Sequence, residues 1–144
     1  MKTVKTAITI PENLLQKLDN FLEKMKLKSR SKVISEALTE YLTEREWLLT
    51  TEGRVIGLLV MIYDEKRGET VKRVLDIQHD FIHSARFTFH VHLSHDRCLE
   101  VVFLEGEKKT ILSLINRIEQ IVGVRIVRFI PIEVEEVSQQ RLHH

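Results

Sequence analysis

The sequence predicts an α+β protein with two parts, a small strand-helix-helix unit followed by an antiparallel sheet that carries two helices. The hydrophobic residues after residue 10 recur first at helical spacing and later in alternating strand and helix patterns. The polar segment 49–54, which contains Thr50, Thr51 and Gly53, separates the two regions as a predicted linker. With 144 residues, 43% of them hydrophobic, the chain can form one medium or two small domains, and a single large enzyme domain is not expected.

The first part, residues 1–48, begins with the segment 3–10, in which hydrophobic and polar residues alternate as in a half-buried strand. Pro11 then precedes a helix with one hydrophobic face, and Ser29 or Ser31 can cap a second helix. A lone strand has two unpaired edges, and two short helices bury little hydrophobic surface. We therefore expect a symmetric dimer in which two copies of the strand pair antiparallel.

The second part, residues 55–137, shows the element order β-α-β-β-α-β, which is typical of a ferredoxin-like domain with both helices on one face of the sheet. Residues 138–144 are predicted to be a tail. The predicted strands are 55–63, 87–93, 98–106 and 124–134, and the predicted helices are 68–82 and 110–122.

Charge and cysteine content limit the function classes. The formal net charge is only +1, so the whole chain is not a general polyanion binder. A single cysteine excludes an intrachain disulfide, and no segment resembles a secretion signal or the roughly 20-residue hydrophobic run of a membrane span. We expect a cytoplasmic protein that does not associate with membranes.

The N-terminal part is basic, with eight lysine and arginine residues against three acidic residues in positions 1–32. A two-stranded ribbon fits the major groove of duplex DNA, and the N-terminus of the second helix offers backbone N–H groups to a phosphate. The alternative is a dimerisation arm whose outer face is simply solvated. The side chains or positions predicted to contact DNA are Lys5, Ala7, Thr9, Ser29, Arg30 and Ser31.

A cluster of metal-ligand residues lies in the second part. His90 and His92 are two residues apart in a predicted strand, so both imidazoles lie on the same face. Cys98 begins the next strand, and His79 on the preceding helix can add a fourth ligand from the same subunit or from a neighbour. Three imidazoles and a thiolate suit Ni(II), Cu(II) or Zn(II), and the spacing alone does not choose between these metals.

A catalytic role is not expected for these residues. Four protein ligands close the coordination sphere, whereas metal catalysis needs an open position. The sequence also has no glycine-rich phosphate loop and no third group that would orient a cysteine–histidine pair. His83 is expected at the surface or as an accessory ligand, and His95, in a turn, is expected to be exposed.

The segment 78–106, QHDFIHSARFTFHVHLSHDRCLEVVFLEG, resembles the NikR family of nickel-responsive repressors, whose signature is Q-H, then H-V-H, then a cysteine in C-L-E. The first part resembles that family's ribbon-helix-helix DNA-binding domain. The resemblance implies a homotetramer, a dimer of dimers with four ACT-like domains at its core, in which Ni(II) binding promotes binding to a palindromic operator. It also implies square-planar Ni(II) held by His90, His92 and Cys98 of one subunit and His79 of another, with Gln78 and Glu100 supporting the ligands.

Two positions depart from the family pattern. Lys5, Ala7 and Thr9 fall at the strand positions that read operator bases, and Ala7 replaces the polar residue usual at the middle position. Lys32 stands where the family commonly has a glutamate that helps to hold a cation between the domains, while Glu36 keeps an acidic group one turn later. An ammonium group at Lys32 can substitute for that cation, or the interdomain cation site is absent.

Two other function classes compete with a nickel-responsive repressor of nickel uptake. One is a carrier or storage protein for Ni, Cu or Zn that uses its first part only to dimerise and does not bind DNA. The other is an ACT-like sensor of an amino acid, which would need a ligand pocket at the sheet interface instead of a histidine cluster.

Overall fold

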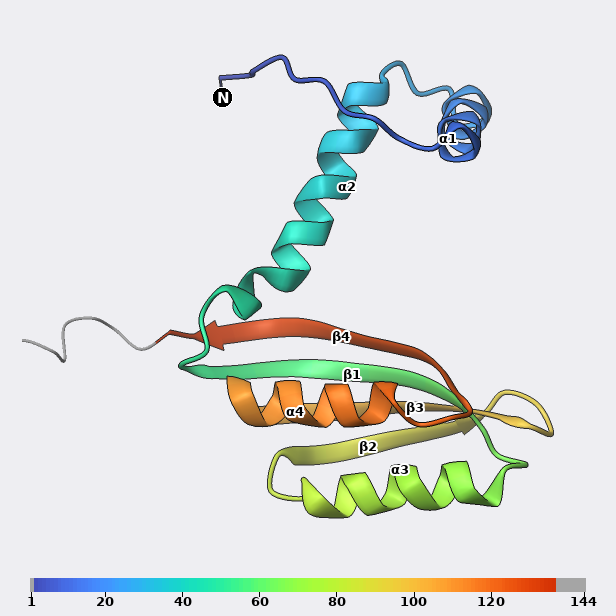
Figure 1. Cartoon of the computed structure of the whole chain (residues 1–144), viewed down its shortest axis with the longest axis vertical. Coiled ribbons are helices and arrows are strands. Elements are labelled where there is room, and N and C mark those ends of the chain that lie inside the picture. Colours follow the sequence, from blue (N-terminus) through green and yellow to red (C-terminus); the bar gives the residue numbers. More distant parts are fainter. Residues whose placement is uncertain (1, 137–144) are drawn as a thin grey trace, which may run out of the picture. The chain divides into compact units, whose positions relative to one another are not determined.

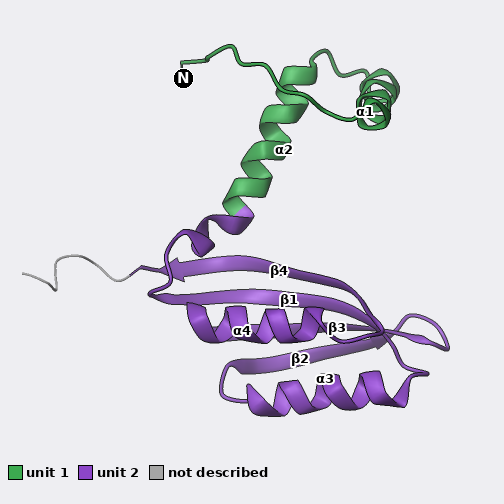
Figure 2. Cartoon of the chain, viewed as in Figure 1, with its two compact units in different colours: residues 1–43 green, residues 44–144 purple. Residues whose placement is uncertain are grey.

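The computed structural model describes residues 2–136 and divides the chain into two compact units, residues 1–43 and 44–144 (Figure 2). The predicted tail, 138–144, lies outside the described residues. None of the helices in the described range combines the length and the hydrophobicity needed to cross a lipid bilayer.

The first unit contains the helix α1 (Glu12–Lys24) and most of the helix α2 (Arg30–Arg45). No residue of either helix is buried, and hydrophobic side chains such as Phe21 and Leu38 are half exposed. The segment predicted as a strand, 3–10, forms no strand within the single chain. The physical reason is that a strand needs a hydrogen-bonded neighbour, and this unit contains no second strand among its described residues.

Two contacts fix the beginning of α2. The Ser29 hydroxyl accepts a hydrogen bond from the Lys32 backbone N–H at 3.2 Å, so Ser29 rather than Ser31 caps the helix. The Arg30 guanidinium donates to both carboxylate oxygens of Asp19 on α1, at 2.9 and 2.8 Å. This hydrogen bonding lowers the pKa of the Asp19 carboxyl.

The second unit is a four-stranded sheet in the order β2-β3-β1-β4, and all neighbouring strands are antiparallel (Figure 1). The order of elements along the chain confirms the predicted β-α-β-β-α-β pattern. The strands are β1 (Arg54–Asp64), β2 (Ala85–His92), β3 (Arg97–Glu107) and β4 (Val124–Glu135), and the helices are α3 (Gly68–Asp80) and α4 (Lys108–Glu119).

The hydrophobic core lies between one face of the sheet and the two helices. Burial alternates along β1 and β3, so that every second residue is covered. Leu59 and Leu104 point to the covered face and pack with Val74 of α3 and Ile111 of α4. The other face carries hydrophobic side chains that the single chain leaves exposed, including Phe89, which is 61% exposed.

The segment predicted to be a linker is fixed to the second unit. A 3₁₀ helix, Glu46–Leu49, buries Trp47, whose ring meets the Phe129 ring edge-on at 5.1 Å between centroids. The buried Lys108 ammonium donates to the Thr50 hydroxyl at 2.8 Å and to the Glu136 carboxylate at 2.7 Å. The sheet therefore anchors the helical turn just before the predicted linker 49–54, and α4 anchors the linker itself at Thr50.

We predict that Gly57→Ala destabilises the second unit. A Cβ at Gly57 would overlap the Phe129 ring and would lie 2.6 Å from the Ile130 carbonyl oxygen. Overpacking of this kind costs about 1–3 kcal/mol of unfolding free energy, which urea denaturation measures. Gly68→Ala is the matched control, because nothing lies within 4 Å of the added methyl group. Equal stability of the two variants would contradict the packing described here.

Candidate metal centre

The strand register brings the candidate ligands together on the helix-covered face. Cys98 on β3 pairs with Tyr63 on β1 at one side and with His92 on the edge strand β2 at the other. In the next row, Glu100 of β3 pairs with His90 of β2. Residues two apart on a strand share a face, so both rows point the same way.

Cys98 and His90 are in direct contact. The Cys98 sulfur lies 2.6 Å from His90 Nε2, and the cysteine is fully buried in the single chain. Burial raises the pKa of the Cys98 thiol. Because a metal binds the thiolate, binding at this sulfur must release a proton.

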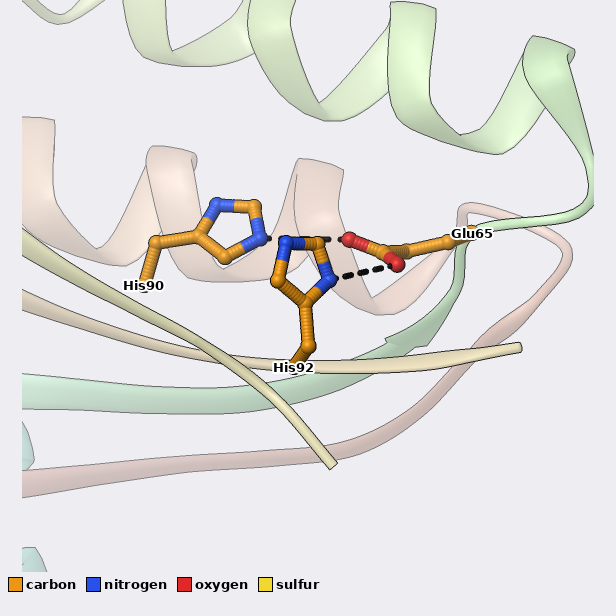
Figure 3. Close-up of side chains that lie close together, drawn as sticks. All are labelled: Glu65, His90 and His92. Carbon is orange, nitrogen blue, oxygen red and sulfur yellow. Dashed lines mark hydrogen bonds and ion pairs between the residues drawn. The ribbon is translucent and has the colours of Figure 1, made fainter. Parts of the chain in front are cut away.

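His90 and His92 also meet Glu65, a residue that sequence analysis did not identify (Figure 3). Glu65 Oε1 lies 3.2 Å from His90 Nε2, and Glu65 Oε2 lies 2.8 Å from His92 Nδ1. One ligand atom from each of the three residues lies within 4.8 Å of the others. Burial acts to raise the pKa of the Glu65 carboxyl, but the hydrogen bonds from His92 and His90 together lower it.

A buried carboxyl group lies behind His90. Glu100 is 3% exposed, and its Oε2 accepts a hydrogen bond from Gln78 Nε2 of α3 at 2.8 Å. Its Oε1 lies 3.8 Å from His90 Nδ1, the nitrogen that faces away from Cys98 and Glu65. Burial raises the pKa of the Glu100 carboxyl. Such a carboxyl can fix the tautomer and the orientation of a ligand imidazole.

His79 lies apart from this cluster. It is exposed in the last turn of α3 and belongs to no group of three or more metal-ligand atoms in the described part of the chain. His83 and His95 are also exposed. His95 lines a surface hollow together with Glu65 and His92, so the hollow opens beside the two candidate ligands.

Two residues near the cluster, Tyr63 and Glu65, were missed, because Tyr63 was assigned only as the last residue of the predicted strand 55–63 and Glu65 lies beyond the end of that strand. The buried positions of β1 alternate up to Tyr63, and Glu65 continues the same period of two. The Tyr63 ring meets the His90 ring edge-on, with centroids 6.4 Å apart, and burial raises the pKa of its hydroxyl. This alternation was the available signal for the face on which both residues lie.

The fold and the cluster define a class of protein, a ferredoxin-like domain with soft metal-ligand side chains attached to a helical unit. Residues 56–132 match the family model of the NikR C-terminal nickel-binding domain. The chain belongs to the NikR family, and Ni(II) is the metal of this domain.

Relatives support the same assignment over most of the chain. A protein of Methanocella arvoryzae named "Putative nickel-responsive regulator" is 35% identical over 125 residues, 87% of this chain and 89% of that protein. "Putative nickel-responsive regulator 1" of Methanosarcina mazei is 32% identical over 136 residues, 94% of this chain and 93% of that protein. An uncharacterized protein from Thermotoga maritima has a similar solved structure with TM-score 0.52 at 20% identity, covering 56% of this chain and 99% of that one. This last likeness concerns the fold alone.

We predict that Gln78→Leu destabilises the second unit by about 1–3 kcal/mol, because it leaves the buried Glu100 carboxyl without its amide donor. Urea denaturation of the metal-free protein measures the change. Gln120→Leu, at an exposed position just after α4, provides the control. If both substitutions had the same small effect, the Gln78–Glu100 hydrogen bond would not be the stabilising contact.

Proposed function

We propose that this protein is a nickel-responsive transcriptional regulator that binds a specific DNA operator and represses nickel uptake. The observation that carries this proposal is the direct contact of Cys98 with His90, whose ring lies beside that of His92, in a NikR-family nickel-binding domain. A regulator of this kind acts on DNA in the cytoplasm and has no enzymatic activity.

The donor chemistry fits nickel. Two imidazoles and a thiolate from one subunit, with His79 of a second subunit as the fourth donor, form a soft set that suits Ni(II). When bound, nickel supplies a positive charge that holds donors of two chains at one point. Gln78 and Glu100 keep His90 oriented from behind, and the exposed position of His79 leaves its imidazole accessible to a neighbouring chain.

Uncovered hydrophobic surfaces favour self-association in both units. On the sheet face that no helix covers, Phe87 stacks on Phe103 at 6.0 Å between centroids and is still 57% exposed. In the first unit, the strand-like segment 3–10 pairs with no strand in the described range 2–136, and hydrophobic side chains of α1 and α2 are exposed. Large exposed hydrophobic surfaces mark interaction sites. These features support a homotetramer built from two ribbon-helix-helix dimers.

The DNA contacts in this proposal come from the first unit. Lys5, Ala7 and Thr9 are exposed and alternate along one side of the predicted ribbon. At the start of α2, Arg30 is engaged by Asp19, so phosphate contacts are assigned to the Ser29–Ser31 backbone and hydroxyl groups. Lys32 and Glu36 lie exposed one turn apart on α2, and an interdomain cation site at these positions stays a prediction.

Regulation requires that metal binding favour one arrangement of the DNA-binding dimers. A ligand that binds two arrangements equally well changes neither population. In this proposal, metal binding brings His79 of one chain to Cys98 and the histidines of another. This contact stabilises the arrangement in which both ribbons reach the half-sites of one operator.

We predict that removal of nickel by a chelator lowers operator affinity by about tenfold or more, in line with coupling free energies of 1–3 kcal/mol. Fluorescence anisotropy with labelled promoter fragments, with and without nickel, measures this. Equally tight and selective binding by metal-free protein would exclude the switch. If no fragment bound selectively with nickel present, the metal carrier function would be favoured instead.

We predict that Cys98→Ala abolishes the sulfur-to-nickel charge-transfer absorption of the loaded protein, because that band requires the thiolate as a ligand. Absorption spectra of the two proteins at equal nickel loading test this. The control is Ser94→Ala, in the β2–β3 turn, which leaves every proposed ligand in place. Persistence of the band in the cysteine variant would remove Cys98 from the ligand set.

A further inference from the structure

A second set of donors overlaps the proposed nickel ligands but needs only one chain. Glu65, His90 and His92 bring together one carboxylate and two imidazoles, and each is positioned by its own chain (Figure 3). The four-donor nickel set contains Cys98 and His79 and has no carboxylate. The two sets therefore differ in chemistry as well as in the number of subunits that they need.

Glu65 is held in place by its backbone. Its N–H donates to the Asp96 carbonyl oxygen in the β2–β3 turn at 2.8 Å, and the preceding Asp64 N–H donates to the Gly123 carbonyl oxygen at 3.0 Å. These two bonds fix the segment beside the end of β2. The carboxylate is consequently directed at His90 and His92 by the fold rather than by a flexible loop.

The Glu65 carboxylate contacts two imidazoles, although an ammonium and a guanidinium group follow it in the sequence. Arg67 pairs with Asp64 at 3.7 Å, while both oxygens of Glu65 are directed at ring nitrogens, one at His90 and one at His92. One ligand atom from each of the three residues lies within 4.8 Å of the others, and neighbouring ligand atoms on a tetrahedral zinc ion are about 3.4 Å apart. Small side-chain shifts would be enough to admit an ion.

We propose that Glu65, His90 and His92 form a divalent-metal site within a single subunit, suited to Zn(II) or Co(II). Two imidazoles and one carboxylate are a ligand combination that zinc accepts with a water molecule in the fourth position. The side chains of His90 and His92 are 42% and 72% exposed, so an ion can reach them from solvent.

The consequence for regulation rests on the proposed nickel-dependent function. His90 and His92 belong to both donor sets, so the two sites cannot be filled together in one subunit. An ion held with Glu65 does not recruit His79 from a second chain. Metals that prefer an oxygen donor would thus bind at the single-subunit site, whereas the metal that links subunits would bind at the four-donor site.

The test uses full-length protein carrying His79→Ala and Cys98→Ala, a background that removes the two donors unique to the nickel set. Titration with Co(II), followed by its visible absorption and by competition with Zn(II), is expected to give one ion per chain. Adding Glu65→Gln removes one of the three protein ligands and should weaken Co(II) binding at least about tenfold. Even the loss of a hydrogen bond that supports a ligand costs about that much. Glu69→Gln, an exposed carboxylate on α3, is the matched control and should leave the affinity unchanged.

Unchanged Co(II) affinity and absorption after Glu65→Gln would overturn the proposal, as would an absence of binding in a background variant that keeps the circular dichroism of the parent protein. A second measurement covers a background that fails to fold. In otherwise unaltered protein, Glu65→Gln should weaken Zn(II) binding more than nickel binding, and equal losses for both metals would contradict the site. If nickel did not promote operator binding by the unaltered protein, the proposed function would be wrong. The expected Co(II) titration would be the same in that case.

Discussion

The antiparallel register of β3 with both of its neighbours is the constraint on which the metal centre depends. This register places Cys98 between Tyr63 and His92, and it places Glu100 beside His90. Side chains alternate between the two faces of a strand, so a shift of one residue would turn Cys98 to the open face of the sheet. Val102 and Leu104, which lie on the same face of β3 as Cys98 and Glu100, resist such a shift, because they belong to the core that this face forms with α3 and α4.

The same register forces polar groups into a hydrophobic environment. Cys98 and Glu100 lie on the covered face together with Val102 and Leu104, where an unpaired polar group would cost about 1–3 kcal/mol. The Glu100 carboxyl accepts a hydrogen bond from the Gln78 amide, and the Cys98 sulfur contacts the His90 ring nitrogen. Among the described residues, no buried side-chain polar atom lacks a hydrogen-bond partner. The site is therefore stable as a polar patch before any ligand is considered.

The sequence predicted the second unit well because each of its elements has a clear local period. The alternation in 55–63 and the helical spacing in 110–122 depend on neighbouring residues only, and the observed elements differ by few residues at their ends. The pairing of Glu65 with the two histidines was not predictable in this way, because it depends on β3 lying between β1 and β2. The strand expected at 3–10 is a different case, since its pattern is that of a strand but the single chain offers no neighbour to complete it.

The position of His79 follows from the contact made by the residue before it. Successive residues on an α-helix are rotated by about 100°. Because Gln78 points inward to bond Glu100, His79 is turned away from its own chain's His90 and Cys98 and toward solvent. The hydrogen bond that holds Glu100 beside His90 thus also keeps His79 away from the cluster of its own chain. In the proposed regulator, a four-donor site that includes His79 would therefore draw on a second chain, and this would link metal binding to subunit association.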